Sequence, residues 1–374
     1  MSRPGDRPRA TGAWLEGDPV GHRLFHDAGD LKLESGTVLP DVRLAYETWG
    51  TFDGGNAVLV EHALTGDSHV TGEAGPGHPT PGWWADVVGP GLAIDTDRWF
   101  VVAPHHLGGC QGSTGPASRH PDGGRWGSRF PHVTIRDQVA AELTLADALG
   151  VERWHAVVGG SAGGMRALEW AVTAPERVER LFLLASSAAA SAEQVALSTI
   201  QVDAIRSDRR FRGGDYYEAD EGPTTGLDLA RRVAHVAYRS EAELQQRFGR
   251  AEQDDVPVAE GGRWAVESYL QHHGAKLVRR FDANSYVTLT RAMDSHDVGR
   301  GRGGTAAALA RVTARTVVAG IDSDRLYPLH QQRELADGLR GSGDLRVVTS
   351  LHGHDGFLVE ADQVGALARE LLDA

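Results

Sequence analysis

The chain has 374 residues, 41% hydrophobic and 24% charged, which is typical of a folded globular protein and excludes a disordered one. The formal net charge of −13 argues against nucleic acid as the main partner, although a few arginines could still focus a local positive field for a small anion. No apolar run reaches the 18 residues of a membrane-spanning helix, so we expect no membrane partner.

The cysteine content and the first residues bear on the cellular compartment. Cys110 is the only cysteine, which rules out an intrachain disulfide and a cysteine-based zinc site. Residues 1–17 are polar and lack the apolar segment of a secretory signal. We therefore expect a cytoplasmic protein.

Short apolar runs, separated by glycine-rich turns, indicate β-strands along much of the chain. In chain order they cover residues 43–50, 57–64, 99–104, 154–158, 178–184, 316–321 and 345–350. The runs at 181–185 and 316–321 are apolar on both faces, which is typical of strands in a parallel sheet that is covered on both sides.

Amphipathic helices are predicted between these runs. Thr134 and Asp137 resemble a capping box, and apolar residues then recur on one helical face as far as Gly150. A second helix is expected after Gly163 and ends at Pro175. Strands that alternate with helices predict an α/β fold with right-handed crossovers.

Residues 188–304 have a different pattern from the rest of the chain. They are charged, helix-patterned and poor in β-runs, as in residues 228–240 and 265–280. The strand pattern resumes only afterwards. We therefore expect a helical lid, residues 188–304, inserted into one α/β core made of residues 1–187 and 305–374. A separate second domain is the alternative.

The sharpest local motif is GGSAGG at residues 159–164, which contains Gly-x-Ser-x-Gly between a predicted strand and a predicted helix. In this context the serine, Ser161, sits on a sharp turn at a helix N-terminus, where the dipole favours a developing oxyanion. Glycines are needed two residues to either side because side chains there would collide with neighbouring backbone. The alternative interpretation is an ordinary glycine-rich turn.

A serine nucleophile needs a base that is itself oriented by a carboxylate, and in α/β-hydrolases the acid and then the base follow the serine. The strand at 316–321 leads into Asp322 and Asp324, and the final strand leads into His352 and His354. Spacing alone does not choose within either pair. Without Ser161 upstream, all four would be read as turn or surface residues.

An oxyanion hole needs two backbone N–H groups. One is expected from Ala162, the residue after the serine, and the other from the loop after an early strand. The run at 57–64 places Leu64 within reach as this second donor. The polar turn that follows Leu64 could otherwise serve only to close a loop.

Six segments resemble the homoserine O-acetyltransferase family in the same order along nearly the whole chain. They are HALTGDSH (62–69), LGGCQGSTGP (107–116), FPHVTIRD (130–137), GSAGGM (160–165), SDRLYP (323–328) and GHDGF (353–357). The resemblance implies an α/β-hydrolase fold, with a mostly parallel sheet covered by helices on both faces. It also implies Ser161 as the acyl-accepting nucleophile, Asp324 as the acid and His354 as the base.

The resemblance further implies that Arg231 and Asp355 bind the substrate. Homoserine is a zwitterion, so a bidentate arginine suits its carboxylate and an acid suits its ammonium group. Arg232, the next residue, is the alternative to Arg231 for this role. In this family a methionine often follows the serine, and here Ala162 stands there; its N–H is kept, but the acyl pocket is altered. Cys110 is expected to be a packed residue of a glycine-rich loop.

The activity that the resemblance implies is transfer of an acetyl group from acetyl-CoA to the side-chain hydroxyl of L-homoserine, giving O-acetyl-L-homoserine for methionine biosynthesis. It implies no metal, no tightly bound cofactor and a homodimer. The motifs leave open a succinyl donor, as in homoserine O-succinyltransferase, or L-serine as acceptor, as in serine O-acetyltransferase. A serine esterase or thioesterase, and a non-enzymatic binding protein of the same fold, are further alternatives.

Overall fold

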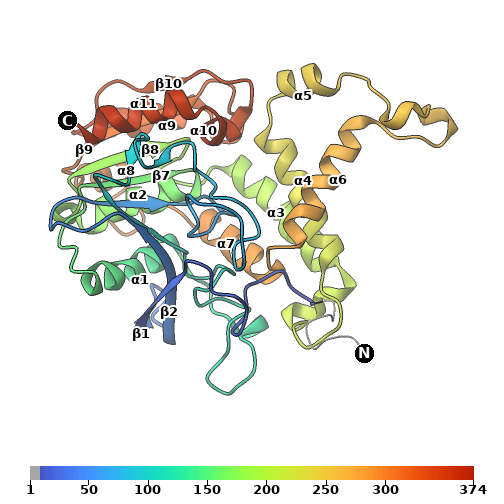
Figure 1. The fold of residues 1–374 in the computed structure, drawn as a ribbon, viewed down its shortest axis with the longest axis horizontal. Coiled ribbons are helices and arrows are strands. Elements are labelled where there is room, and N and C mark those ends of the chain that lie inside the picture. The colour runs from blue at the N-terminus through green and yellow to red at the C-terminus, as the bar shows by residue number, and fades with distance from the viewer. Residues whose placement is uncertain (1–8) are drawn as a thin grey trace.

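The computed structural model describes residues 9–374, apart from the side chain of residue 255 (Figure 1). An eight-stranded sheet forms its centre, in the order β1-β2-β6-β3-β7-β8-β9-β10. These strands are β1 (Leu24–Lys32), β2 (Val38–Trp49), β3 (Ala57–Glu61), β6 (Phe100–Pro104), β7 (Ala156–Gly160), β8 (Arg180–Leu184), β9 (Arg315–Ile321) and β10 (Arg346–Val348). The pairs β1–β2 and β2–β6 are antiparallel and the others are parallel. A small second sheet joins β4 (Val88–Gly89) to β5 (Ile94–Asp95).

Helices cover both faces of the large sheet (Figure 1). They are α1 (Ile135–Ala148), α2 (Ala162–Thr173), α8 (Thr305–Leu309) and α9 (Leu329–Gly338) on one face, and α10 (Gly356–Val359) and α11 (Ala361–Leu372) on the other. Alternate strand residues point to opposite faces, so Leu59 and Val157 pack with the first group, and Val58 and Val158 with the second. The core therefore has two apolar layers with the sheet between them.

The predicted first helix is confirmed. Thr134 caps α1, its side chain accepts the N–H of Asp137, and the Asp137 side chain accepts the N–H of Thr134 in return. The predicted second helix is confirmed as α2, which begins directly after Ser161.

The predicted strands differ from the structure at several bounds, β4 and β5 were not predicted, and two further differences have a clear cause. Strand β1 is absent from the prediction because its pairing with β2 is irregular on both sides of Gly29, and this breaks the alternation of apolar and polar residues. The run at 57–64 ends as a strand at Glu61, because residues 62–66 turn away from the sheet in a loop that Gly66 closes by donating its N–H to Ala63 O.

Five helices of eight or more residues lie between β8 and β9 in the chain. They are α3 (Ala192–Ser207), α4 (Thr224–Tyr238), α5 (Glu241–Phe248), α6 (Ala265–Val278) and α7 (Ala283–Asp294). In Figure 1, α4, α5 and α6 form the part to the right, and α7 lies near the centre, below the sheet. Helix α7 packs against the sheet region, since Ala292 contacts Met165 of α2 and Ile135 of α1.

The N-terminal segment, residues 10–14, runs between these helices and the sheet region. The Gly12 N–H donates to Phe281 O (3.2 Å), just before α7, and the Trp14 N–H donates to Cys110 O (2.9 Å). A Cβ atom on Gly12 would lie 2.6 Å from the backbone nitrogen of Arg280, so only glycine fits there. Within residues 9–374, no helix has the length and apolar character that crossing a bilayer requires.

Candidate active site

Ser161 occupies the sharp turn between β7 and α2. Its backbone angles, φ 56° and ψ −124°, lie where a residue with a side chain is strained. Two hydrogen bonds hold this turn: the Ser161 N–H donates to Leu184 O (2.9 Å), and the Ser186 hydroxyl donates to Ser161 O (2.9 Å). The neighbouring strand β8 therefore fixes the turn from both sides of the serine peptide.

Glycines on both sides of Ser161 permit this turn. A Cβ atom on Gly159 would lie 2.2 Å from Gly163 O, and one on Gly163 would lie 2.0 Å from Glu61 O. Both contacts are with backbone, which cannot move aside without shifting β3 or α2. The predicted need for glycine at these positions is confirmed by these distances.

His354 connects Ser161 to Asp324. The Ser161 Oγ lies 2.8 Å from His354 Nε2, and His354 Nδ1 lies 2.7 Å from Asp324 Oδ2. The other oxygen of Asp324 accepts the N–H groups of Leu326 (2.8 Å) and Tyr327 (2.9 Å), which orients the carboxylate toward the imidazole. We call Ser161, His354 and Asp324 the triad. All three are buried.

The electrostatics of the triad favour a basic imidazole. Burial by itself lowers the pKa of His354, but the negative charge of Asp324 and the hydrogen bond to it outweigh burial, so the pKa is raised above its ordinary value. With Nδ1–H donating to the carboxylate, Nε2 is free to accept a proton from the serine hydroxyl.

The structure separates the two pairs of candidates that spacing left open. Asp322 Oδ1 accepts the N–H of Ser350 (3.0 Å) and so closes a turn between the ends of β9 and β10. His352 is partly exposed and lies 3.4 Å from a carboxylate oxygen of Glu243. Neither residue takes part in the hydrogen bonds of the triad.

The two predicted oxyanion donors lie on adjoining segments. Ala162 is the first residue of α2, and the N–H groups of a first helical turn have no acceptor within the helix. Leu64 lies in the loop after β3, and the start of α2 packs directly against residues 61 and 62. Both residues are buried in the same apolar cluster.

Arg231 and Asp355 both lie near the triad, but they have different partners. Arg231 on α4 approaches Thr65 Oγ1 (3.4 Å), and its guanidinium lies 5.4 Å from the ring centre of Tyr238, which is itself 5.8 Å from the His354 ring. Arg232 instead forms an ion pair with Asp228 on its own helix.

Asp355 is engaged by a residue that sequence reasoning missed. Arg239 follows α4 directly, and its Nε lies 3.1 Å from Asp355 Oδ2, while its Nη1 lies 3.1 Å from Glu243 Oε1. An arginine near a predicted substrate-binding arginine gave no separate signal in the sequence, because helical charges usually face solvent. Arg239 and Asp355 meet only because the end of α4 lies against the loop after β10.

A small cavity adjoins the triad. It has a volume of about 40 Å³ and is lined in part by Leu64, Met165, Tyr238 and Tyr327. The ring of Tyr327 stacks on the imidazole of His354 with 5.0 Å between ring centres. Tyr327 therefore contacts both the cavity and the triad, although no triad residue lines the cavity itself.

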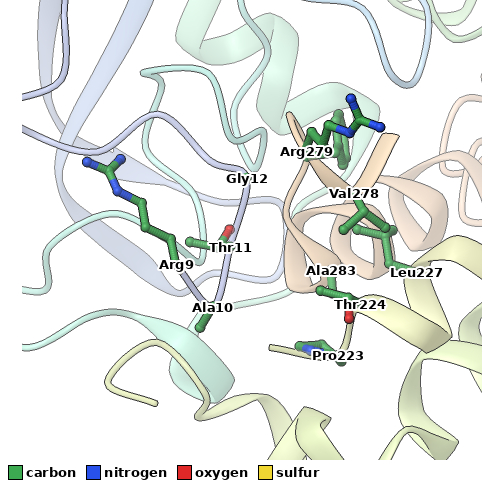
Figure 2. Close-up of a pocket in the computed structure, with 11 residues that line it drawn as sticks. Arg9, Ala10, Thr11, Gly12, Pro223, Thr224, Leu227, Val278, Arg279 and Ala283 are labelled. Carbon is green, nitrogen blue, oxygen red and sulfur yellow. The ribbon is translucent and has the colours of Figure 1, made fainter. Parts of the chain in front are cut away.

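A larger cavity lies apart from the triad. It has a volume of about 330 Å³ between residues 9–12 and the ends of α4 and α6 (Figure 2). Arg9 and Arg279 flank it, and no triad residue lines it. No triad residue lines the small cavity either, but its lining includes Tyr327, which stacks on His354, so we place the chemistry on the side of the small cavity.

A buried ionic group behind the triad was also missed. Arg166, on α2, donates from Nε to Glu61 Oε2 (2.7 Å), from Nη1 to His106 Nδ1 (2.9 Å) and from Nη2 to His62 O (2.8 Å). The available signal was an arginine, with Glu169, in a helix that is otherwise largely apolar, which implies buried partners. The sequence could not identify the partners of Arg166, because Glu61 and His62 lie at the end of β3 and His106 follows the end of β6.

Two groups of buried side chains have the composition of metal sites: His62, His105 and His106, and a second group of Glu47, His69 and His78. In the first group the Nε2 of His106 has no partner, but the guanidinium of Arg166 lies against the same ring and opposes a second cation.

In the second group, hydrogen bonds occupy both nitrogens of His69 and Nε2 of His78, and Nδ1 of His78 has no partner in the part of the chain that the structure describes. The two nitrogens of His69 face Glu47 Oε2 (2.9 Å) and Glu73 O (3.2 Å), and the His22 N–H donates to His78 Nε2 (3.0 Å). We interpret both groups as polar parts of the core that are satisfied mainly by internal hydrogen bonds.

The fold and the triad geometry define an enzyme-like member of the α/β-hydrolase class. Residues 56–361 match the family model described as alpha/beta hydrolase fold, which confirms the predicted fold class.

The curated relatives narrow this class. The chain is 63% identical over 367 residues to a homoserine O-acetyltransferase of Thermobifida fusca (strain YX), with 97% of each chain covered. A crystal structure of homoserine O-acetyltransferase from Bacillus anthracis is similar, with a TM-score of 0.86 and 27% identity over 94% of this chain and 97% of that one. A crystal structure of an esterase has a TM-score of 0.85 and 26% identity over 94% of this chain and 99% of that one. The chain belongs to the homoserine O-acetyltransferase family.

Proposed function

We propose that this protein transfers an acetyl group from acetyl-CoA to the hydroxyl of L-homoserine and forms O-acetyl-L-homoserine for methionine biosynthesis. The observation that carries the proposal is the series of hydrogen bonds from Asp324 through His354 to Ser161, next to a small cavity. Relatives named for this reaction, at up to 63% identity, support it. Neither half-reaction requires a metal or a tightly bound cofactor.

In the first half-reaction Ser161 accepts the acyl group. His354 Nε2 takes the hydroxyl proton as Ser161 Oγ attacks the thioester carbonyl, and the oxyanion is held by the N–H groups of Leu64 and Ala162. The C–S bond then breaks, and His354 donates the proton that it took from Ser161 to the CoA sulfur. The products are acetyl-Ser161 and free CoA.

In the second half-reaction the homoserine hydroxyl takes the place that the serine hydroxyl had. His354 Nε2 removes its proton as the oxygen attacks the acetyl-serine carbonyl, and the same N–H groups hold the second oxyanion. Breaking the acyl–Oγ bond returns the proton to Ser161 and releases O-acetyl-L-homoserine.

We assign binding of the acceptor to Arg231 and Asp355. The two side chains have opposite charges and both act on Tyr238, whose pKa is raised by burial, lowered by Arg231 and raised by Asp355. A zwitterionic amino acid with its hydroxyl at His354 offers a carboxylate for the first and an ammonium group for the second. Arg239 holds one oxygen of Asp355 and leaves the other available.

The cavity beside the triad favours acetyl over succinyl. Its volume of about 40 Å³ is roughly the space of three water molecules. Its lining includes Asp294 and, among the residues that the structure describes, no arginine or lysine that would neutralise a succinyl carboxylate. A buried, unpaired carboxylate there would carry a large desolvation cost.

We also propose that residues 188–304 act as a lid over the core of residues 1–187 and 305–374. Transfer competes with hydrolysis, because water can attack acetyl-Ser161 as well. Helices α3, α4 and α7 contribute most of the lining of the cavity, and this supports a shielding role.

Two finer statements belong to this proposal. We propose a homodimer, as expected from the family resemblance, and sedimentation of the purified protein at several concentrations would test it. We also propose the cytoplasm as the compartment, since the reaction consumes a CoA thioester and a metabolic amino acid, and cell fractionation would test it.

The decisive experiment is a matrix of donors and acceptors. Acetyl-, propionyl- and succinyl-CoA would each be tested with homoserine, serine and water, and CoA release and product mass measured. We expect acetyl-CoA with L-homoserine to be fastest and Ser161→Ala to abolish the reaction. CoA release that is the same with and without homoserine would instead indicate a thioesterase.

Arg231→Met tests acceptor binding, with Arg232→Met as its matched control. Removing a charge-assisted contact to the carboxylate should raise the KM for homoserine about tenfold or more. Hydrolysis of p-nitrophenyl acetate, which needs no amino acid, should change little in either variant. A raised KM in Arg232→Met alone would contradict the assignment.

A further inference from the structure

A series of hydrogen bonds between two buried histidines ends on the peptide group that carries the Leu64 N–H. The backbone N–H of Gln111 donates to His105 Nε2 (2.9 Å), and His105 Nδ1 lies 3.2 Å from His62 Nε2. His62 Nδ1 then lies 2.8 Å from Ala63 O. The proposed triad chemistry does not use either ring.

The two ends of this series fix the direction of every hydrogen bond in it. A backbone N–H can only donate and a carbonyl can only accept, so each ring receives one hydrogen bond and gives the next. His105 and His62 must therefore both be neutral, with the proton on Nδ1. Burial is the main cause that holds the pKa of both imidazoles well below the ordinary value, so they stay neutral.

The final acceptor of this series, Ala63 O, is the atom that connects the two histidines to the Leu64 N–H. Ala63 O and the Leu64 N–H belong to one planar peptide group, so fixing the carbonyl also fixes the direction of the N–H. Ala63 O accepts from His62 and also from the Gly66 N–H (2.9 Å). Hydrogen bonds to a carbonyl polarise its amide, which makes the Leu64 N–H a stronger donor to an oxyanion.

Arg166 holds the preceding peptide group. Its Nη2 donates to His62 O (2.8 Å), and both of its other donating nitrogens are also engaged. Arg166 lies one turn into α2, the helix whose first residue, Ala162, supplies the other oxyanion donor. One buried side chain therefore ties the loop that bears Leu64 to the helix that bears Ala162.

We propose that His62 and His105 are positioning residues of the oxyanion hole, which orient and polarise the Ala63–Leu64 peptide group through a fixed neutral tautomer. This inference rests on the proposed function only in that it assumes an acyl-Ser161 whose oxyanion the Leu64 N–H binds. It excludes proton transfer through the two rings, because their hydrogen bonds end on backbone groups.

The first test compares His62→Leu with His62→Asn. Leucine removes the donor to Ala63 O, whereas the asparagine Nδ2 stands at the place of the imidazole Nδ1 and can donate in its stead. The readout is the first-turnover release of p-nitrophenolate from p-nitrophenyl acetate. We expect His62→Leu to acylate about tenfold more slowly, less than the loss of a whole oxyanion donor, and His62→Asn to recover most of that rate.

The matched control is His155→Leu. His155 also bonds a backbone carbonyl, Leu372 O (3.0 Å), but it precedes β7 and so lies at the opposite end of that strand from Ser161. Its acylation rate should equal that of the unchanged protein. A vibrational measurement separates positioning from loss of structure: the labelled carbonyl of acetyl-Ser161 should move to a higher stretching frequency in His62→Leu.

Three outcomes would overturn the inference: an unchanged rate and frequency in His62→Leu, equal losses in His62→Leu and His62→Asn, or a loss in His155→Leu as large as in His62→Leu. If the His62 variants do not fold, nitrogen NMR of the unchanged protein decides, since a proton on His62 Nε2 would contradict the tautomer. An unchanged protein that is acylated but transfers nothing to homoserine would refute the proposed function and leave these comparisons intact.

Discussion

Ser161 combines the reacting hydroxyl with a strained backbone, and the two properties can be separated by substitution. Its φ of 56° is rare for residues with a side chain. Strain of this kind costs about 1–3 kcal/mol. The hydrogen bonds from Ser161 N–H and to Ser161 O show how the surrounding structure maintains it.

We predict that Ser161→Gly and Ser161→Ala both abolish acyl transfer, but that only the glycine variant relieves the strain. Glycine adopts this conformation without steric strain, at a modest entropic cost. The free energy of unfolding of Ser161→Gly should therefore exceed that of Ser161→Ala by about 1 kcal/mol. Urea unfolding of both variants measures the difference. Equal stabilities would show that the turn is not strained.

We predict that acylation by acetyl-CoA rises with pH through the pKa of His354, because only the neutral imidazole accepts the serine proton. That pKa is raised above its ordinary value of about 6.5 by Asp324. In Asp324→Asn the midpoint should move to lower pH, and the plateau of kcat/KM should fall by about 10³–10⁴-fold.

The control for this pH dependence is Asp322→Asn, because Asp322 only accepts a backbone N–H in a turn. It should keep the midpoint of the unchanged protein. A midpoint that moved in Asp322→Asn but not in Asp324→Asn would reverse the assignment of the acid.

At the scale of elements, the contact between the start of α2 and the end of β3 sets the relative position of Ala162 and Leu64, the two proposed oxyanion donors. Gly163 makes this contact possible, since a Cβ atom there would lie 2.0 Å from Glu61 O. Backbone touches backbone at this point, so the helix cannot accommodate a methyl group by a side-chain rotation.

We predict that Gly163→Ala pushes α2 away from β3, lowers the free energy of unfolding by about 1–3 kcal/mol, and slows acylation at least tenfold. Gly343→Ala is the control, because a Cβ atom on Gly343 meets nothing within 4 Å. Urea unfolding and first-turnover acylation measure both effects. Normal acylation by Gly163→Ala would show that the donors tolerate this shift.

The sequence could predict the elements that carry a local signal, and it missed those that depend on distant neighbours. The glycine turn around Ser161 and the cap at Thr134 follow from local rules and were predicted. Asp322 and Asp324 are equivalent in spacing, and they differ only in which loop faces them once β9 and β10 are side by side. Strand β1 was missed because irregular pairing at Gly29 breaks its alternation.

The buried polar groups depend on distant neighbours even more than the strands do, so they were harder to predict from the sequence. Arg166, His62 and His105 come from three separate segments, and only Arg166, in a largely apolar helix, carries a local signal of burial. Their hydrogen bonds depend on the end of β3, the end of β6 and α2 meeting behind the triad. No local sequence pattern predicts contacts between segments so far apart in the chain.

For the whole molecule, the N-terminal segment packs against the residues before α7, and one of these, Arg280, contacts the loop after β3. Gly12 lies against Arg280, and the Arg280 guanidinium donates to Thr65 O (2.8 Å), next to Leu64. The hydroxyl of Thr11 also donates to Asp282 (2.7 Å), which caps α7.

We predict that Gly12→Val loosens these contacts and increases hydrolysis of the acetyl-enzyme relative to transfer, because water then reaches Ser161 more easily. The ratio of acetate to O-acetyl-L-homoserine at fixed substrate concentrations measures the effect. Gly55→Ala, at an open position, should leave that ratio unchanged. A normal ratio in Gly12→Val would show that the segment plays no part in shielding.

This arrangement has a practical consequence for anyone who attaches something to the protein. The segment at residues 10–14 lies between Phe281, which precedes α7, and the glycine-rich loop of Cys110, whereas α11 ends on the far side of the sheet (Figure 1). An affinity tag, a fluorescent protein or a solid support joined behind α11 should leave product yield intact. The same addition ahead of residue 10 should lower product yield, because residues 10–14 carry the backbone hydrogen bonds to Phe281 and Cys110.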